Sequence, residues 1–164
     1  MGQASHAAAV LIVDDEQDVL DSFEPLFREH FADVAVATAA SGDAALEAMR
    51  GTTFDLVLCD FRMPGMDGLE VLAHVVRRSP RTARILMTAF ADLDLAVRAV
   101  NEGHVDFLLR KPFEVEDLLD ATTRALAKSL DEQTRDRLLG LQSAMGQDAS
   151  RILHAPWPLE VQQP

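Results

Sequence analysis

Five short apolar segments alternate with amphipathic segments along this chain of 164 residues. Valine, isoleucine and leucine dominate the apolar segments, which are nearly uninterrupted, as expected of parallel strands buried on both faces. The segments between them carry apolar residues at helical spacing. This alternation predicts an α/β fold, a doubly wound parallel sheet of five strands with helices on both faces. The predicted strands are Ala9–Val13, Val34–Ala37, Phe54–Cys59, Ile85–Met87 and Val105–Leu109.

Local signals indicate where the intervening helices begin and which side faces the core. Ser41 and Asp92 are residue types that cap helix amino ends, so they predict the starts of the second and fourth helices. In the fourth helix, Val97 and Val100 are expected to face the sheet. Pro25 lies inside the apolar stripe of the first helix and is expected to kink it or loosen one turn.

Composition divides the chain into three parts. We predict a flexible leader over residues 1–8, an α/β domain over 9–127, and an extension over 128–164 that starts as a helix and ends extended. Apolar residues from Leu130 onward continue a helical stripe into the extension. Glycines such as Gly140 interrupt this stripe, which disfavours a long rigid coiled coil.

The charge balance limits the partners of this chain. Lysine and arginine number 15 against 27 aspartate and glutamate residues, a formal net charge of −12. Because nucleic acids and anionic membranes are themselves negative, this segment is expected to bind neither. No apolar run approaches the ~20 residues of a membrane span. The single cysteine, Cys59, argues against a disulfide framework and suits a reducing compartment, so a cytoplasmic location is expected.

Polar residues follow the predicted strands at their carboxyl ends. These residues are Asp14 and Asp15 after the first strand, Asp60 after the third, Thr88 after the fourth and Lys111 after the fifth. In an open parallel sheet these ends meet at one edge, where such folds bind ligands. Crowded carboxylates repel one another, and a hard cation such as Mg²⁺ removes that conflict. The pattern predicts phosphoryl transfer onto Asp60, with a metal held by Asp14 and Asp15.

Four segments of the chain match a known family in order and in approximate spacing. They are Leu11-Ile12-Val13-Asp14-Asp15-Glu16, Asp60-Phe61-Arg62-Met63-Pro64-Gly65-Met66-Asp67-Gly68, Met87-Thr88-Ala89 and Lys111-Pro112-Phe113. With these segments the chain resembles the receiver domain of two-component response regulators over roughly Ala9–Ala127. The segment that begins at Asp60, taken together with the Lys111-Pro112 pair, is the most specific part of the resemblance.

The resemblance implies a fold, a modification and a metal. The fold is flavodoxin-like with strand order 2-1-3-4-5. The modification is phosphorylation of Asp60 by a sensor histidine kinase or a histidine phosphotransfer protein. Mg²⁺, or Mn²⁺ in its place, would be bound by Asp15, by Asp60 and by the backbone carbonyl of Arg62. Asp14 would act mainly through a metal-bound water.

The resemblance also implies how the phosphoryl group is recognised. Thr88 and the backbone N–H of Ala89 would hydrogen-bond this group, and Lys111 would pair with one of its oxygens. The Lys111–Pro112 peptide bond is expected to be cis. Phosphorylation adds about −1.5 to −2 charge, and we expect the loops that carry Thr88 and Lys111 to move toward it.

Neighbouring side chains are expected to modulate the switch. In the family, side chains at the places of Arg62 and Phe90 flank the phosphoryl group and influence its lifetime. An aromatic residue usually stands three positions before the lysine, where this chain has Leu108, with Phe107 one position earlier. Either a bulge in the fifth strand re-aims Phe107, or the aromatic part of the switch is absent, which we favour slightly.

Three functions fit these residues. The leading interpretation is a phosphorylation-controlled signalling module of a phosphorelay, which catalyses only its own phosphotransfer and slow dephosphorylation. The alternatives are a Mg²⁺-dependent phosphohydrolase with an aspartyl nucleophile, and a receiver-like module that binds partners without phosphorylation. Such hydrolases commonly carry a second aspartate two residues after the nucleophile, where this chain has Arg62. The intact set of acids, hydroxyl and lysine argues against the last alternative.

The extension over 128–164 also has three interpretations. It is the extension of a stand-alone receiver, the linker of a longer regulator, or a dimerisation helix. It is short for a DNA-binding or catalytic output module and has no basic reading helix. We favour an extension that packs on the receiver or on a second copy. A homodimer would use helix 4, strand 5 and helix 5, or this C-terminal helix.

Overall fold

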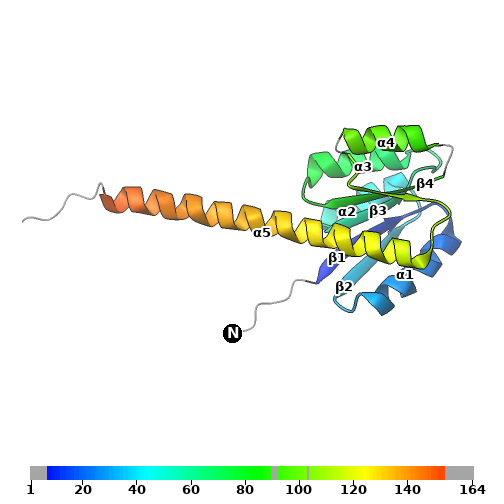
Figure 1. Cartoon of the computed structure of the whole chain (residues 1–164), viewed down its shortest axis with the longest axis horizontal. Helices are drawn as coiled ribbons and strands as arrows, with labels where there is room; N and C mark the ends of the chain where they lie inside the picture. Colours follow the sequence, from blue (N-terminus) through cyan, green and yellow to red (C-terminus); the bar gives the residue numbers. More distant parts are fainter. Residues whose placement is uncertain (1–6, 90–91, 103, 154–164) are drawn as a thin grey trace, which may run out of the picture. The chain divides into compact units, whose positions relative to one another are not determined.

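The chain folds around one parallel sheet of five strands in the order β2-β1-β3-β4-β5. The computed structural model describes residues 7–89, 92–102 and 104–153. The predicted fold class and strand order are confirmed, and Figure 1 shows the strands with helices on both sides. The strands are β1 (Ala8–Val13), β2 (Val34–Ala39), β3 (Leu56–Asp60), β4 (Ala83–Thr88) and β5 (Phe107–Arg110).

Two strands begin two residues later than predicted, directly after an aspartate whose side chain accepts a backbone N–H of the neighbouring strand. β3 begins at Leu56 rather than Phe54, since the Asp55 carboxylate accepts the backbone N–H of Ala9 at 2.7 Å. β5 begins at Phe107 rather than Val105. The Asp106 carboxylate before it accepts the backbone N–H of Arg84 at 2.9 Å. Side-chain acceptors therefore replace ladder bonds at these strand entrances.

Helices connect the strands and follow the sequence signals in most places. They are α1 (Gln17–His30), α2 (Gly42–Gly51), α3 (Gly68–Arg78), α4 (Leu93–Asn101) and α5 (Val115–Leu153). Ser41 caps α2 as predicted, and its hydroxyl accepts the Ala44 N–H at 3.1 Å. α1 continues through Pro25, which is exposed, so the carbonyl left without an amide partner lies on the solvent side.

The predicted inward face of α4 is wrong. Val97 and Val100 are 45% and 37% exposed, whereas Ala96 and Ala99 are buried against the sheet. The two stripes differ by one position, and the alanines let the helix backbone lie close to its neighbours. The larger valines, which the apolar pattern favoured for the core, are left facing outward.

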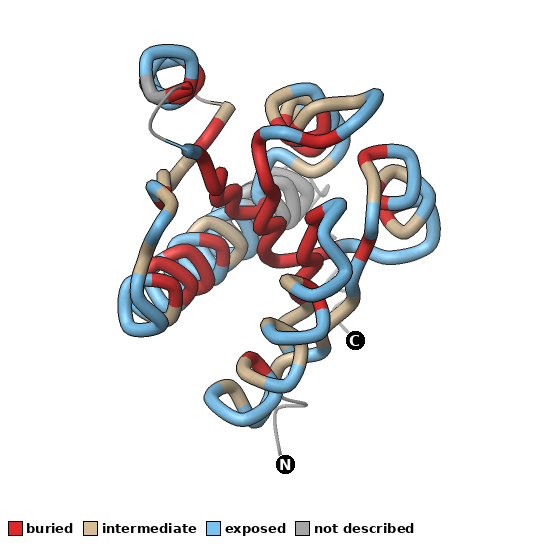
Figure 2. Tube along the Cα trace, turned by 90° about the vertical axis from the view of Figure 1, so that its right-hand side faces the viewer, coloured by how far each residue is buried: buried red, intermediate tan, exposed pale blue. Residues whose placement is uncertain are grey.

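The core lies in two layers, one on each face of the sheet. Alternate residues of β1 separate into them, with Leu11 and Val13 in one cluster and Val10 and Ile12 in the other. Helices α2, α3 and α4 cover the first face, and α1 with the first part of α5 covers the second. Figure 2 shows the buried strands at the centre, with the helices burying only their inward sides.

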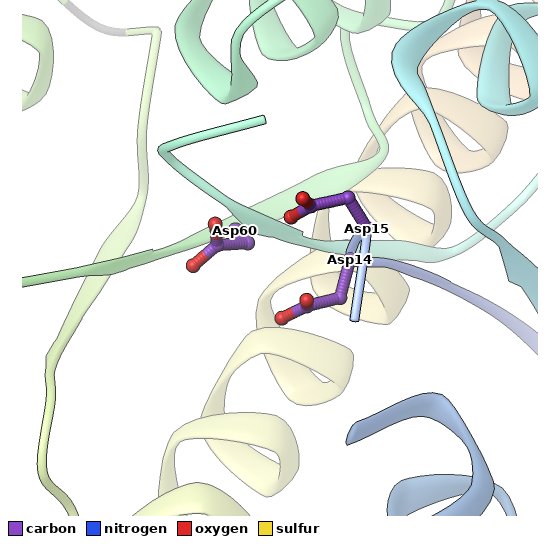
Figure 3. Close-up of side chains that lie close together, drawn as sticks. All are labelled: Asp14, Asp15 and Asp60. Carbon is purple, nitrogen blue, oxygen red and sulfur yellow. The ribbon is translucent and has the colours of Figure 1, made fainter. Parts of the chain in front are cut away.

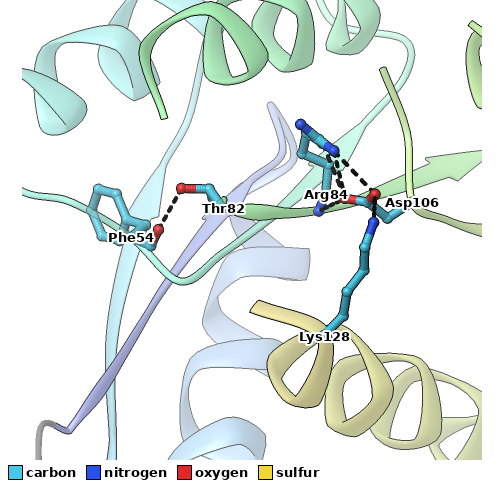
Figure 4. Close-up of polar contacts among 5 residues, drawn as sticks. All are labelled: Phe54, Thr82, Arg84, Asp106 and Lys128. Carbon is cyan, nitrogen blue, oxygen red and sulfur yellow. Dashed lines mark hydrogen bonds and ion pairs between the residues drawn. The ribbon is translucent and has the colours of Figure 1, made fainter. Parts of the chain in front are cut away.

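Polar contacts connect the amino ends of β3, β4 and β5 (Figure 4). The Arg84 guanidinium at the start of β4 makes two hydrogen bonds of 3.0 Å to the Asp106 carboxylate. Lys128 of α5 forms an ion pair with the same carboxylate. Nearby, the Thr82 hydroxyl donates to the Phe54 carbonyl at 2.6 Å. We call Arg84, Asp106 and Lys128 the polar triad; Arg84 is buried, whereas Lys128 is exposed. The triad joins β4, the start of β5 and α5.

The chain divides into two compact units, Met1–Leu130 and Asp131–Pro164. The predicted boundary lies a few residues earlier, at 127, but Ser129 is still fully buried. α5 is helical through Gly140 and Gly146. Residues 1–6 of the predicted leader and the predicted extended end over 154–164 lie outside the described residues. Of the helices in the described ranges, none has both the length and the apolarity needed to cross a bilayer.

Candidate functional site

Three carboxylates meet at the carboxyl edge of the sheet (Figure 3). Asp14 and Asp15 directly follow β1, and Asp60 is the last residue of β3. The two strands are neighbours, with Val13 opposite Cys59, so the residues that follow lie side by side. One oxygen from each of Asp14, Asp15 and Asp60 lies within 4.8 Å of the others. The side-chain cluster predicted from the strand ends is therefore present.

Asp14 carries the least satisfied of these charges. Its side chain is fully buried, and its Oδ1 accepts the backbone N–H of Glu16 at 2.9 Å. Its Oδ2 is buried and makes no hydrogen bond, although Lys111 Nζ lies 3.5 Å away. Burial raises the pKa of Asp14, and the Glu16 N–H and the Lys111 charge only partly offset this. Such a carboxylate is poised to accept a cation.

Lys111 supplies the positive charge in the resting site. Its Nζ donates to Asp60 Oδ1 at 2.6 Å, and its backbone N–H donates to the Thr88 carbonyl at 2.8 Å. The Lys111–Pro112 peptide bond is cis. Burial lowers the pKa of Lys111, but the hydrogen bond and charge of Asp60, together with Asp14, outweigh burial and leave it raised. The lysine is therefore a cation at neutral pH.

Thr88 ends β4 beside β3, the strand that carries Asp60. Asp60 is paired with Met87 in the sheet, so Thr88 lies one residue further along the neighbouring strand. Its side chain is fully buried, and its hydroxyl donates to the Ala89 carbonyl at 3.2 Å. The hydroxyl is thus held by its own loop in this state. The backbone N–H of Ala89 belongs to the same loop. Phe90 lies outside the described residues.

The loop between β3 and α3 is held in one shape by Gly68 and the helix cap that precedes it. Asp67 and Glu70 form a reciprocal capping box, each side chain accepting the other's backbone N–H at 2.9 Å. A Cβ on Gly68 would lie 2.2 Å from the Asp60 carbonyl oxygen, so only glycine fits there. This close approach packs the start of α3 against the backbone of Asp60, the candidate acceptor.

An ion pair that sequence reasoning missed joins the two loops at the site. Arg62 Nε donates to Asp92 Oδ2 at 3.0 Å, and an Arg62 terminal nitrogen pairs with Asp92 Oδ1. Asp92 directly precedes α4 as predicted, but the expected cap bond is absent because its carboxylate accepts no helix amide and binds Arg62 instead. That hydrogen bond holds the pKa of Asp92 below its usual value. The sequence signal that could have predicted this ion pair is that the two residues have opposite charges and lie in the loops after adjacent strands.

Strand β5 decides between the two interpretations of its aromatic residue. Phe107 and Leu108 pair with Ile85 and Leu86 in a regular register that contains no bulge. Phe107 packs with the core cluster on the α1 and α5 side, and the Arg124 guanidinium lies 5.2 Å from its ring centre. Leu108 packs against the opposite cluster, which includes α4 residues. The place of the family's usual aromatic is thus held by leucine.

The donor set fits a hard divalent cation. Three carboxylates converge, one of them with a buried oxygen that accepts no hydrogen bond, and Mg²⁺ prefers such oxygen ligands. The described residues of this cluster include neither a thiol nor an imidazole ligand, which softer metals favour.

The comparisons with known proteins assign the family. The model of the response regulator receiver domain matches residues 10–123. The chain belongs to the response regulator receiver family. The acidic cluster of Asp14, Asp15 and Asp60 is consistent with the metal site typical of receivers.

Several relatives are similar to this receiver over most of its length. The transcriptional regulator NtrC of Klebsiella pneumoniae is 37% identical over 122 residues, which are 74% of this chain and 25% of that protein. The regulator ZraR of Escherichia coli K12 is 37% identical over 127 residues, 76% of this chain and 28% of that protein. The receiver therefore spans about a quarter of the length of these curated relatives.

The solved structures agree. The crystal structure of an adenylate cyclase from Rhodopirellula baltica matches with a TM-score of 0.77 and 31% identity. The match covers 80% of this chain and 96% of that one. Receivers are typically signalling modules rather than enzymes, and a histidine kinase partner is implied by the family.

Proposed function

We propose that this receiver accepts a phosphoryl group on Asp60 from a phosphohistidine of a sensor kinase or phosphotransfer protein. One observation carries the proposal. The Asp60 carboxylate is bound to Lys111 Nζ at 2.6 Å while the carboxylates of Asp14 and Asp15 lie beside it. A carboxylate among other carboxylates and one ammonium is suited to form a phosphoryl anhydride, because cations neutralise the charge that arrives.

The transfer is a substitution at phosphorus. An Asp60 carboxylate oxygen attacks the phosphorus atom, the new O–P bond forms and the P–N bond to the donor histidine breaks. The electron pair of that bond goes to the imidazole nitrogen, which takes up a proton. Lys111 Nζ then moves from Asp60 Oδ1 to a phosphoryl oxygen. Mg²⁺ held by Asp14, Asp15, Asp60 and the Arg62 carbonyl would supply Lewis-acid neutralisation of the phosphoryl charge.

The same residues connect phosphorylation to a surface. The Thr88 hydroxyl, bound in this state to the Ala89 carbonyl, would turn to the phosphoryl group with the Ala89 N–H, and α4 directly follows this loop. α4 exposes Leu95, Val97 and Val100, an apolar set that supports a partner or dimer surface on α4, β5 and α5.

A second dimer surface is proposed along the later part of α5. Leu130, Leu138 and Leu139 are each at least half exposed. A helix of 39 residues that exposes leucines is better stabilised by a partner helix than by water. The phosphoryl donor protein, the dimer and the cytoplasmic location stay predictions.

The experiment is phosphorylation of the full chain with acetyl phosphate and Mg²⁺, followed by intact-mass analysis. We expect the wild type to gain one phosphoryl group and Asp60→Asn to gain none. Asp120→Asn, an exposed carboxylate change on α5, is the matched control and should be modified like the wild type. Rapid release of phosphate over many turnovers without a modified protein would contradict the proposal and favour a hydrolase.

A further inference from the structure

The Arg62–Asp92 pair connects the candidate acceptor to the start of α4. Arg62 stands two residues after Asp60, and Asp92 directly precedes α4, four residues after Thr88. The Arg62 guanidinium contacts both Asp92 oxygens and lies 5.1 Å from the centre of the Phe61 ring. The loops that carry the acceptor and the hydroxyl are therefore bridged by one side-chain pair.

Asp92 is in the capping position of α4 but does not cap it. The caps of α2 and α3, Ser41 and Asp67, have extended backbones with ψ of 164° and 169°, and their side chains accept helix amides. Asp92 has ψ of 8° and accepts none. In this structure both of its carboxylate oxygens bind Arg62 and neither accepts an amide of α4, so capping α4 would require the backbone and side chain of Asp92 to move away from Arg62.

Helix caps and ion pairs with an exposed partner have similar general strengths, so a new charge near Arg62 can decide between pairing and capping. Arg62, whose side chain is 71% exposed, is such a partner. Phosphorylation of Asp60 would add a dianionic group with three acceptor oxygens two residues from Arg62. A guanidinium group binds phosphate strongly through two parallel hydrogen bonds (bidentate binding). The phosphoryl group would therefore compete with Asp92 for Arg62.

We propose that Asp92 is a positioning residue that holds Arg62 in the unphosphorylated receiver and caps α4 in the phosphorylated one. On phosphorylation, which the proposed function supplies, Arg62 exchanges the Asp92 carboxylate for the phosphoryl group. The freed Asp92 moves to an extended backbone and caps α4. This exchange of ion-pair partners changes the conformation of the first turn of α4. The exposed side chain of Leu95 moves with that turn.

The first test needs no phosphorylation and uses the full chain. Asp92→Asn cannot form the ion pair, but asparagine caps helices as well as aspartate. Arg62→Met also frees the Asp92 carboxylate. In both variants we expect amide hydrogen exchange at Asp94 and Leu95, the second and third residues of α4, to slow about fivefold. Asp92→Ala, which can neither pair nor cap, should show no slowing.

Two features distinguish this exchange from a general change of charge or packing. Asp92→Asn and Arg62→Met alter the net charge in opposite directions yet should give the same slowing. The double variant should add nothing, since either change alone frees the cap. Unchanged exchange in both single variants, or equal slowing in Asp92→Ala, would overturn the proposal.

The second test compares states of phosphorylation. After acetyl phosphate and Mg²⁺, amide exchange at Asp94 and Leu95 of the wild type should slow by a similar factor. In Arg62→Met it should not slow further. If intact mass shows that the wild type takes no phosphoryl group, the proposed function fails while the first test still decides the Arg62–Asp92 exchange. A modified wild type whose α4 amides exchange unchanged would refute the coupling itself.

Discussion

At Gly68 the fold has no room for a side chain. An added Cβ would lie 2.2 Å from the Asp60 carbonyl oxygen and 2.9 Å from Phe61 Cα, both backbone atoms that cannot swing aside. We expect Gly68→Ala to lower the free energy of unfolding by roughly 1–3 kcal/mol or more, as overpacking does. Because the displaced backbone carries Asp60, phosphorylation by acetyl phosphate should also slow. Urea unfolding and intact-mass time courses measure the two effects.

Gly51 offers the matched control for this change. It is the last residue of α2, and an added Cβ there meets nothing within 4 Å. Gly51→Ala should be neutral or stabilise by at most about 1 kcal/mol, because alanine is the better helix former. Equal losses in Gly51→Ala and Gly68→Ala would show that the close approach at Asp60 is not the cause.

The site residues differ in how far the sequence could predict their contacts. Asp14, Asp60 and Lys111 come directly after apolar strands, so parallel-sheet topology alone brings them to one edge. The Arg62–Asp92 pair was missed because its partners lie 30 positions apart in two loops. Loop conformation decides that contact, and strand periodicity carries no information about it. In addition, an aspartate before a helix gives the same sequence signal whether or not its side chain caps the helix.

Among the elements, β4, β5 and α5 are joined by the polar triad of Arg84, Asp106 and Lys128. Burial raises the pKa of Asp106, but the hydrogen bonds from Arg84 and Lys128 outweigh burial and leave it lowered. Asp106→Asn would leave the buried Arg84 guanidinium without its counter-charge. We expect a loss of about 3 kcal/mol in the free energy of unfolding at pH 7, measured by urea unfolding.

The pH dependence of this loss has a defined sign. Since the folded pKa of Asp106 lies below the ordinary aspartate value of about 3.9, its stabilisation is present above that pH and disappears as the pH falls through the folded value. The gap between wild type and Asp106→Asn should therefore shrink below about pH 4. Asp120→Asn, in an exposed pair with Arg124 at 3.6 Å, should cost less than about 0.5 kcal/mol. A gap that is constant with pH would contradict this account.

Which side of a helix faces the core was harder to predict than the order of the helices and strands. Strand order followed from the alternation of apolar and amphipathic segments, but the inward side of α4 did not. Its stripes through Ala96 and through Val97 differ by one position, and hydrophobicity favours the valine that the fold leaves exposed. The distance between the helix and the sheet decides which of the two stripes faces inward, and the sequence does not contain that distance.

For the whole molecule, the acidic cluster links metal binding to stability. We expect Mg²⁺ at about 100 times its dissociation constant to raise the free energy of unfolding by about 2.7 kcal/mol. Asp15→Asn should lose most of this gain, since it removes one carboxylate of the cluster. Without Mg²⁺ the same variant should be slightly more stable than the wild type, because one repulsive charge is gone.

Thermal unfolding with and without Mg²⁺ checks this linkage in the absence of any phosphoryl donor. Asp120→Asn serves again as the control and should respond to Mg²⁺ like the wild type. Equal Mg²⁺ responses in Asp15→Asn and the wild type would exclude Asp15 as a ligand.

The division of the chain into two units predicts where it can be shortened. Burial in the first unit persists to Ser129, and the chain divides after Leu130. A chain ending at Leu130 should keep the Mg²⁺-dependent unfolding midpoint of the full chain within a few degrees, roughly 1 kcal/mol. If the later part of α5 forms the dimer, light scattering should find a dimer for the full chain and a monomer for the shortened one. A dimer that survives shortening would move the interface to the first unit.

The single thiol of the chain, at Cys59, can report local opening of the fold. The side chain is fully buried in β3, and burial together with the charge of Asp60 raises its pKa, so it reacts only when the strand opens. Its rate of alkylation in the folded protein would therefore measure how often β3, the strand that carries Asp60, opens. A fluorophore placed on a cysteine introduced at the surface would label that site alone, because the native sulfur stays out of reach.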